Sequence, residues 1–474
     1  MGVRRSLGIT MMPEFAQCEG VNAVVEAIGG RLGADVLVTT PSVVEPVAAG
    51  LGVREPPDDG GAGNDRTLDR ALWGRTALHI RSAPSFAPDP ARYAGLAYRP
   101  PVADALTARE GPVVGRLLDA AKAAGLKVQL QLMAAAPPAI RVQERAPRDR
   151  DEPLTPYGAA VPGRVDANRS LASEDLRAYM RALIGDVLAN YPQCDALRFD
   201  WPEYPPYAPA SLMFDFSPAA VQRGAALGHD VEGLRRRVTG ELSAWRGAGR
   251  LPAARGLDAL LAGTPVLAEL ISYRAALVAD YVTALTGMVR ELSGGRVEAV
   301  MQAFPPPLNR LSGFDYAALD GVPAEIAVKQ YTMHWPMIER AHVAGVAAGA
   351  GVSEAAALEF VRPLLGLDDA PPGPVEHIVY PEPDRPHPAG SALLGAMAAA
   401  ACGAITRSRA SVIVHGYGPT DDVLRRFDAV AAASPCLHIN RYGYLSDAKI
   451  AALGARWQAL AGTGHTQKQG GLPA

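Results

Sequence analysis

Short runs of aliphatic and β-branched residues alternate along the chain with longer stretches in which apolar residues return every three to four positions. Runs of the first kind are typical of buried strands, and spacing of the second kind is typical of amphipathic helices. The short runs predict strands at 6–12, 34–42, 76–86, 126–134, 194–200, 296–304, 324–335, 375–383 and 410–418. The helical spacing is clearest at 113–125, at 269–294 and at 174–192, where Ser173 provides an N-terminal cap.

Strands that alternate with helices in this way predict an α/β protein with a parallel sheet. Roughly eight repeats of strand and helix fit a (β/α)8 TIM barrel better than an open doubly wound sheet. An open sheet that binds a dinucleotide would also need a G-x-G-x-x-G turn after an early strand, and the chain has none there. Polar and aromatic residues follow nearly every predicted strand, as expected if the loops at one mouth of a barrel build a common site.

The region after the strand at 194–200 is unusually long. Residues 215–262 form an arginine-rich stretch of helical character, interrupted by RGAGRLPAARG. Because a connecting loop needs far less chain, we expect a helical insertion at about 208–265, after the fourth barrel strand. The prediction is a single barrel domain over residues 1–461 that contains this insertion, followed by a polar, Gly-rich and flexible C-terminal tail at 462–474.

Composition and charge narrow the classes of function. The chain has 474 residues and a formal net charge of −3, and its acids and bases are interspersed, so nucleic-acid binding is not expected. It has no apolar stretch long enough to span a bilayer and no signal-peptide pattern at its start, so we expect a cytoplasmic protein with no membrane partner. Its four cysteines lie far apart without a C-x-x-C pair, which argues against a disulfide scaffold or a structural zinc site.

The stretch LRFDWPEYPPY, residues 197–207, combines acids and aromatics at a predicted strand end. Alternate residues of a strand share a face, so Arg198 and Asp200 are expected to point together into the barrel. A buried Arg and a buried Asp are costly unless paired, so we expect an Arg198–Asp200 ion pair that keeps Asp200 ionised as a nucleophile or charge-stabilising carboxylate. A purely structural pair is the alternative.

Glu203 follows among aromatic residues, and an apolar setting of this kind raises the pKa of a carboxyl group, which suits a proton donor. Two carboxylates in different environments are what glycoside hydrolysis requires. A sugar also presents C–H faces that stack on aromatic rings and hydroxyl groups that need polar partners. The candidate stacking residues are Trp201, Tyr204, Trp335 and Tyr380. The polar candidates for substrate binding are Arg198, Gln302, Lys329, His334 and His415.

Glu382 is the third candidate for a catalytic carboxylate. It ends the predicted strand at 375–383 and is bracketed by prolines. Glu14 repeats the Pro-Glu pattern after the first strand, but a structural role is expected there. Glu382, Asp384 and His387 are close in sequence, yet they lack the spacing of a known metal motif, so we predict neither a metal nor a cofactor.

The stretch SEDLRAYMRALIGDVLANYPQCDALRFDWPEYPPY resembles glycoside hydrolases with an amylase-like barrel. In those proteins a helix ending in YP leads into a fourth strand of the form D-G-[IL]-R-x-D-[WY], matched here by DALRFDW at 195–201. The segment HINRYGYLSD at 438–447 also resembles the closing segment of such chains. The resemblance implies a nucleophilic role for Asp200. It departs after the fifth strand, where the acid/base glutamate would stand and this chain has Gln302; a seventh-strand carboxylate could map to Glu382.

These residues predict an enzyme that acts on a carbohydrate or small glycoside, most simply by hydrolysing a glycosidic bond. Asp200 would be the nucleophile or stabilising charge, and Glu203 or Glu382 the general acid/base. Lysine is rare in this chain, so Lys329 suggests an alternative, a Schiff-base lyase or aldolase. A second alternative is a non-catalytic sugar-binding barrel, in which Gln302 marks a lost acid. The sequence leaves a homo-oligomer open.

Overall fold

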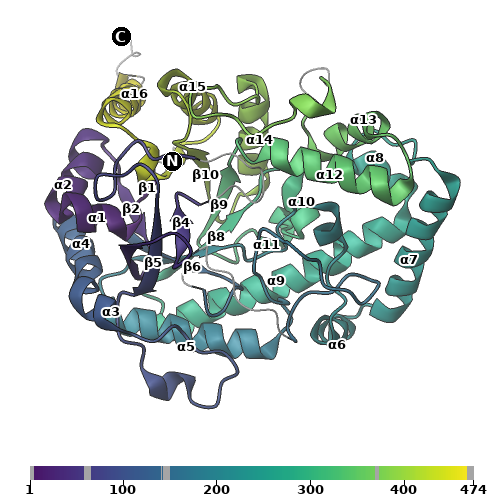
Figure 1. Ribbon diagram of the computed structural model, residues 1–474, viewed down its shortest axis with the longest axis horizontal. Helices are drawn as coiled ribbons and strands as arrows, with labels where there is room; N and C mark the ends of the chain where they lie inside the picture. The colour runs from purple at the N-terminus through teal and green to yellow at the C-terminus, as the bar shows by residue number, and fades with distance from the viewer. Residues whose placement is uncertain (1–4, 58–65, 140, 142–149, 369–372, 467–474) are drawn as a thin grey trace, which may run out of the picture.

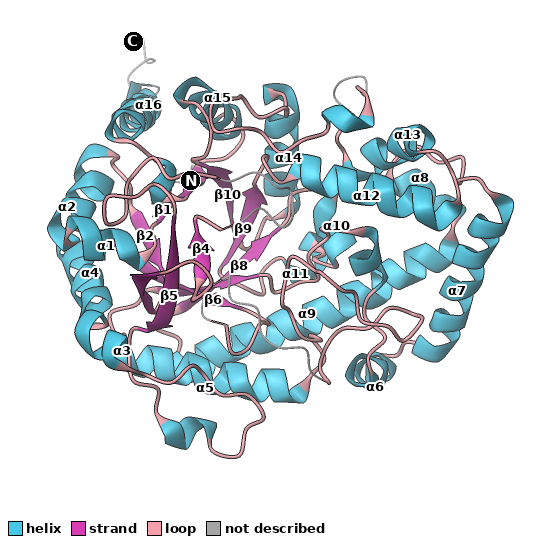
Figure 2. Cartoon of the chain, in the orientation of Figure 1, coloured by secondary structure: helices cyan, strands magenta, loops and turns pink. Residues whose placement is uncertain are grey.

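Eight parallel strands close into a barrel (Figures 1 and 2), which confirms the predicted (β/α)8 class. The computed structural model describes residues 5–57, 66–139, 141, 150–368 and 373–466. In chain order the barrel strands are β1 (Ser6–Thr10), β2 (Val36–Thr39), β6 (Lys127–Met133), β7 (Ala196–Asp200), β8 (Glu298–Ala303), β9 (Glu325–Gln330), β10 (Arg409–His415) and β11 (Cys436–Asn440). The ring closes where β11 pairs with β1, with Ser6 opposite Cys436.

Helices follow each barrel strand, because the apolar outward faces of the strands need a covering layer. Over the first half of the barrel these are α1 (Pro13–Glu19), α2 (Val21–Val25), the π-helical turn η1 (Glu26–Arg31), α3 (Ala105–Glu110), α4 (Pro112–Ala123) and α5 (Glu174–Asn190). Over the second half they are α10 (Leu308–Ser312), α11 (Tyr316–Leu319), α12 (Trp335–Ala350), α13 (Glu354–Leu365), α14 (Ser391–Ala404), α15 (Thr420–Ala431) and α16 (Asp447–Thr466). Short 3-10 turns lie at η2 (Pro90–Tyr93), η4 (Val375–His377) and η5 (Tyr442–Tyr444).

The segment between β7 and β8 is almost entirely helical. It consists of η3 (Pro209–Met213), α6 (Pro218–Ala226), α7 (Val231–Ala248), α8 (Leu257–Gly263) and the long α9 (Pro265–Ser293). With α12 and α13, these helices extend the molecule to one side of the barrel (Figure 1) and enclose a second hydrophobic core that includes Leu234, Leu260, Tyr273, Val343 and Val361. The part of the chain predicted as an insertion thus shares this second core with α12 and α13.

Two of the predicted strands differ from the structure, and one barrel strand was not predicted. Residues 76–86 do contain a strand, β5 (Leu78–Pro84), but it pairs antiparallel with β3 (Ser42–Val47) and β4 (Val53–Glu55) in a separate sheet. The predicted strand at 375–383 is wrong: it holds only η4 and a loop. The eighth barrel position is taken by β11, which overlaps the start of the segment at 438–447 that resembles a closing segment.

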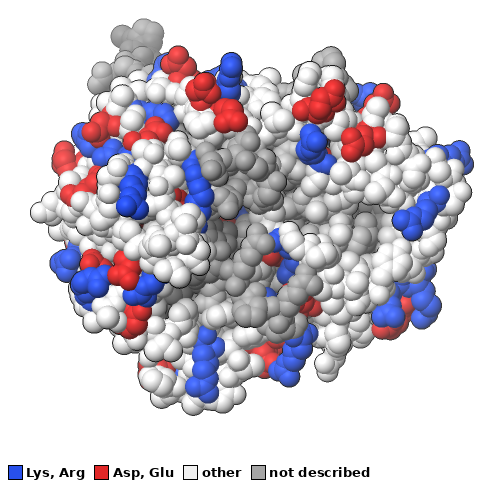
Figure 3. Space-filling view, in the orientation of Figure 1, with Lys and Arg blue, Asp and Glu red and all other residues white. Residues whose placement is uncertain are grey.

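The ends of the chain and its surface complete the description. α16 continues to Thr466, so residues 462–466 are helical rather than part of a tail, and residues 467–474 lie outside the described residues. Basic and acidic side chains are interspersed over the face drawn in Figure 3. Within the described residues no single helix has the length and apolarity to cross a bilayer, and α8 with α9 meets that test only as a pair bent by 115°.

Candidate active site

Asp200 and Glu203 lie at the carboxyl end of β7 and share one cation. Lys329, near the end of β9, places its Nζ 3.3 Å from Asp200 Oδ1 and 3.5 Å from Glu203 Oε1. Because β8 lies between β7 and β9, the lysine reaches across the barrel mouth. The side chain of Asp200 keeps 13% of its surface exposed, whereas that of Glu203 is completely buried. Asp200 is therefore the carboxylate that is open to a substrate.

The position of Lys329 limits the separation of the carboxylates. Placed end to end, the distances of 3.3 and 3.5 Å give 6.8 Å, so Asp200 Oδ1 and Glu203 Oε1 are at most 6.8 Å apart. Lys329 Nζ also stands 4.4 Å from the ring centroid of Phe304, a cation–π contact that helps to fix it. The two acids are thus held together by one positive charge in a largely water-free setting.

Glu203 sits where a protonated carboxyl group fits best. Burial raises the pKa of Glu203 to about 7, although Lys329 and the contact with Ser312 lower it in part. Ser312 Oγ is 2.7 Å from Glu203 Oε2 and 2.8 Å from the carbonyl oxygen of Asn309. The serine hydroxyl has one hydrogen, so it donates either to Glu203 or to Asn309; when Glu203 is protonated, it can donate to Ser312 while Ser312 donates to Asn309. Burial, rather than the contact with Ser312, is what favours the protonated form of Glu203.

Two glutamines extend the site along the neighbouring strands. Gln131 Nε2, on β6, lies 3.5 Å from Asp200 Oδ2, a long contact. Gln302 Nε2, on β8, donates to Gln131 Oε1 at 2.9 Å. The predicted residue Gln302 is therefore near the site, but it acts on Asp200 through Gln131.

The predicted ion pair between Arg198 and Asp200 is wrong. Arg198 does point into the barrel, as strand alternation requires, but deeper than Asp200. Its Nε donates to Gln129 at 3.1 Å, and its Nη2 lies 3.0 and 3.1 Å from the ring nitrogens of His438. Glu325, with Oε1 3.8 Å away, supplies the compensating charge. Burial alone would raise the pKa of Glu325, but His438 and Arg198 hold it well below its usual range.

A strained turn connects the two carboxylates. Trp201 has a φ of 53°, a left-handed conformation that is rare for a bulky residue and costs about 1–3 kcal/mol. Asn168 holds this turn, since its Nδ2 donates to the carbonyl oxygens of Trp201 and Glu203, both at 2.9 Å. Because of this turn, the side chain of Glu203, three residues after Asp200, also reaches Lys329.

Aromatic rings run from this turn along the mouth. The rings of Trp201 and Tyr207 lie 5.9 Å apart in an edge-to-face arrangement. Tyr207 in turn lies 6.1 Å from His334, and His334 lies 6.3 Å from Tyr380. Three of the predicted substrate-binding residues, Trp201, His334 and Tyr380, therefore belong to one wall, which is joined by Tyr207.

His415 ends β10 and extends the wall on its far side. Its ring lies 5.3 Å from that of Tyr331, which also contacts His334 at 5.9 Å. His415 Nδ1 accepts the backbone N–H of Tyr417 at 3.1 Å. Burial holds the pKa of His415 well below its usual range, so the ring is neutral and carries its proton on Nε2. His415 thus keeps one N–H donor at Nε2.

Three predicted residues do not join this arrangement. Tyr204 is buried in the barrel core and donates its hydroxyl to Asp215 Oδ2 at 3.0 Å, so it offers no stacking surface. Trp335 belongs to the second core, as Trp201 and Tyr207 do, but at the start of α12 its ring contacts none of the wall's rings described above. Glu382 is exposed on the loop before α14 and ends no strand, so the predicted strand end at this residue is wrong.

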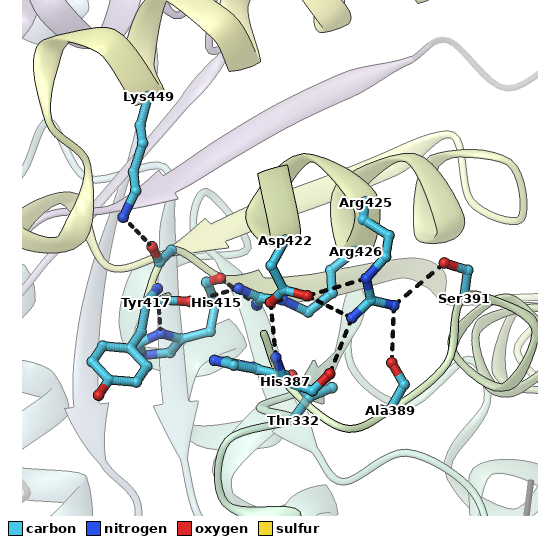
Figure 4. A network of polar contacts seen from close by, with 11 residues as sticks. Thr332, His387, Ala389, Ser391, His415, Tyr417, Asp422, Arg425, Arg426 and Lys449 are labelled. Atoms are coloured by element: carbon cyan, nitrogen blue, oxygen red, sulfur yellow. Dashed lines mark hydrogen bonds and ion pairs between the residues drawn. The ribbon is translucent and has the colours of Figure 1, made fainter. Parts of the chain in front are cut away.

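The loops around His415 are held by a network at the start of α15 (Figure 4). Asp422 pairs with Arg426 at 2.8 Å and accepts the backbone N–H of His387 at 3.2 Å. Arg426 also donates to the carbonyl oxygens of His415 and Tyr417, at 2.7 and 2.5 Å. Because this network joins the loop after β10 to the loop before α14, it fixes two parts of the aromatic wall relative to each other.

A cluster of four buried charges, the mouth cluster, lies among the loops of the first, second, third and eighth strands. It consists of Glu14, Glu55, Arg141 and Arg441. Arg141 binds Glu14 through both Nη atoms, at 2.8 and 3.0 Å, and Glu55 at 3.0 Å. Arg441 is 2.9 Å from Glu55. Burial opposes ionisation of Glu14, but Arg141 lowers its pKa below the usual value, so the predicted structural role for Glu14 fits.

Sequence reasoning missed three residues that contact the carboxylates or their lysine, namely Gln131, Phe304 and Ser312. Gln131 had a signal, because Gln129 and Gln131 alternate within the strand LKVQLQLM and so share its inner face. Ser312 had none, since it belongs to a short helix after β8. In the described part of the chain no group of three or more His, Cys, Asp or Glu side chains is arranged to hold a metal ion.

The fold and the site together define a (β/α)8 barrel with a carboxylate pair and an aromatic wall at the carboxyl ends of its strands. No protein-family model matches the chain, and no curated protein matches its sequence. In structure it resembles the β-galactosidase from the psychrophilic Marinomonas ef1, with a TM-score of 0.51 and 12% identity over 97% of this chain and 60% of that one. It also resembles the catalytic domain of the β-amylase from Paenibacillus polymyxa, with a TM-score of 0.50 and 10% identity over 97% of this chain and 99% of that one.

The chain thus spans 60% of the length of the galactosidase and nearly the whole of the amylase domain. At such low identity the likeness shows the fold alone. That fold is a closed barrel used by two glycoside hydrolases, and the sequence-based expectation of a glycoside-hydrolase-like barrel is confirmed at this level.

Proposed function

We propose that the protein is a carbohydrate-active enzyme that hydrolyses a glycosidic bond. The observation that carries the proposal is the pair of carboxylates around Lys329, one partly exposed and one buried with a pKa raised to about 7. A carboxylate that contacts the substrate and a second carboxyl group that stays protonated near neutral pH are the two components of this chemistry. The barrel fold shared with a β-galactosidase and a β-amylase supports the same class.

In this proposal Asp200 attacks or stabilises the anomeric carbon, and Glu203 acts as general acid/base. The upper limit of 6.8 Å between their oxygens includes the roughly 5–5.5 Å typical of retaining glycosidases and only the lower edge of the roughly 6.5–9.5 Å typical of inverting ones. The limit therefore favours retention of configuration. Lys329 positions both acids, and His415 and the aromatic wall hold the sugar.

The test is turnover of a panel of 4-nitrophenyl glycosides and oligosaccharides by the wild type and three variants. Asp200→Asn should lower kcat by at least about 10³-fold and leave the fold unchanged. Asp258→Asn, which alters an exposed aspartate of α8, should match the wild type. Glu203→Gln should lose most activity towards oligosaccharides, by about 10²–10⁴-fold, but less towards the 4-nitrophenyl substrates, whose leaving group needs little protonation. An Asp200→Asn variant with wild-type turnover would overturn the proposal.

The Schiff-base alternative remains as a second candidate because Lys329 is buried and close to an aromatic ring. Its Nζ is engaged by two carboxylates, however, and this favours a positioning role over a nucleophilic one. Borohydride reduction in the presence of carbonyl substrates, followed by mass spectrometry, separates the two. An adduct on Lys329 would support a lyase or aldolase. A sugar-binding barrel without catalysis would instead bind equally well in the wild type and in Asp200→Asn, with no turnover in either.

A further inference from the structure

A cavity of about 660 Å³ opens next to Tyr207 and Tyr380 of the aromatic wall, between α12 and the loops at 161–165 and 376–380. Its volume lies within the roughly 300–1,000 Å³ typical of small-molecule sites. The cavity does not lie directly over Asp200 and Glu203, since neither residue lines it. Its walls are largely aliphatic and aromatic and include Val165, Met337, Ala341, Ile378, Tyr207 and Tyr380.

Tyr207 connects this cavity to the carboxylates. Its ring lines the cavity and packs edge-to-face on Phe304, at 5.8 Å, and on Trp201. Burial raises the pKa of the Tyr207 hydroxyl, and the nearby charges of Asp200 and Glu203 raise it further. The same side chain thus borders both the cavity and the carboxylates. A molecule bound at Asp200 that reached past the ring of Tyr207 would enter this cavity.

The lining of the cavity is unsuited to a second sugar. Its charged residues are Arg164, Arg340 and Glu376. Arg164 is already engaged by Asp166 at 3.0 Å, and Arg340 and Glu376 are exposed at the outer edge. Val379 leaves 59% of its surface exposed at the same edge, and a ligand in the cavity would remove that apolar surface from water. Sugar hydroxyls placed against aliphatic walls would lose hydrogen bonds to water without replacement.

We propose that this cavity binds an apolar aglycone, so that the substrate is a glycoside with an aryl or short alkyl leaving group rather than a polysaccharide. The inference rests on the proposed hydrolysis, because it places the sugar at Asp200 and the leaving group towards α12. Met337, Ala341 and Ala344 project from one face of α12, at spacings of four and three residues, and form the cavity wall on that side.

Binding of 4-nitrophenol, a free aglycone, tests the cavity without turnover. Ala341→Phe fills the cavity from α12 and should weaken binding at least about tenfold in titration calorimetry, because the ring displaces the apolar contact area of the ligand. Ala348→Phe is the matched control: Ala348 is an exposed alanine of the same helix that does not line the cavity, and its variant should bind as the wild type does. Absence of binding, or equal binding by both variants, would overturn the inference.

Kinetics separate this inference from the proposed function. Ala341→Phe should lower kcat/KM about tenfold for a 4-nitrophenyl glycoside and leave it unchanged for the methyl glycoside of the same sugar. If the wild type hydrolysed both glycosides with the same kcat/KM and Ala341→Phe changed neither value, the aglycone site would be refuted. The proposed hydrolysis would still hold. Binding of 4-nitrophenol to wild type and to Asp200→Asn, without turnover of any glycoside, would refute hydrolysis and with it the aglycone role.

Discussion

Replacing Glu203 by Gln should make the stability of the protein less dependent on pH. Burial raises the pKa of Glu203 from 4.5 to about 7, while the unfolded chain releases the same proton near pH 4.5. Between these values the folded state holds one proton more than the unfolded state, so raising the pH through this window favours unfolding of the wild type. Gln has the same shape and does not ionise, and its amide can donate to Ser312 as the protonated carboxyl group does.

The size of the effect follows from the two pKa values. A change from 4.5 to about 7 corresponds to roughly 3 kcal/mol, at about 1.4 kcal/mol per pKa unit. The free energy of unfolding of Glu203→Gln, relative to that of the wild type, should therefore rise by about 3 kcal/mol between pH 4.5 and pH 8. With an unfolding entropy of about 2.1 cal/mol/K per residue, a chain of 474 residues gives a difference in Tm of ~3 °C.

Other titratable groups near Glu203 could also change the pH dependence of the Tm. Lys329 and Asp200 act on its charge directly, and the hydroxyls of Tyr207 and Tyr316 lie within electrostatic reach. Burial holds the pKa of both tyrosines well above 10, so neither titrates between pH 4.5 and pH 8. Glu203 is therefore the buried acid of this group expected to lose its proton within the window.

The assay is thermal unfolding of wild type, Glu203→Gln and a control at half-unit steps from pH 4.5 to 8.5 and constant ionic strength. Glu359→Gln serves as the control because it replaces an exposed glutamate on α13. Its Tm should follow that of the wild type at every pH. If the Tm difference between Glu203→Gln and wild type is the same at pH 4.5 and pH 8, Glu203 does not hold a proton near neutrality, and the hydrogen-bond assignment to Ser312 is wrong.

Two further substitutions probe the framework of the site. Arg141→Met leaves Glu14 and Glu55 buried without their main partner and should cost about 3–5 kcal/mol, read as a lower urea midpoint; a loss below ~1 kcal/mol would contradict the role of the mouth cluster. Gly8→Ala places a Cβ 2.1 Å from His438 Nδ1 inside the barrel and should destabilise the fold by about 1–3 kcal/mol, seen as a lower Tm by circular dichroism; an unchanged Tm would show that His438 moves aside freely.

The barrel was predictable because its strands are apolar runs separated by amphipathic helices, and these patterns are local. The errors arose where the decisive information is not local. VEHIVYPEP has the β-branched residues of a strand, but prolines flank it, and it finds no partner strand in the described fold. The strand at 436–440, CLHIN, is short and carries polar residues, yet pairing with both β1 and β10 makes it the strand that closes the barrel.

The candidate site shows the same division. Strand alternation correctly placed Arg198 inside the barrel. The partner of a buried arginine, however, depends on which side chains from the other strands reach its guanidinium group. In this barrel those side chains are Glu325 and His438. The contact of Lys329 with Asp200 depends on the diameter of the closed barrel, since the two residues belong to strands that do not pair. The sequence pattern of a single strand does not predict the distance between Lys329 and Asp200.

The mouth cluster also has a consequence for how this chain can be rebuilt. Its four charges come from segments far apart in the chain, and the contact between Glu55 and Arg441 alone spans 386 positions. A loop graft or a chimera that replaced only the region of Glu14 and Glu55 would leave Arg141 and Arg441 buried without their carboxylate partners. The first loop, the small antiparallel sheet, the third loop and the last loop must therefore be transplanted as one module. Recombination between barrels of this architecture should succeed at crossover points that keep all four segments from the same parent.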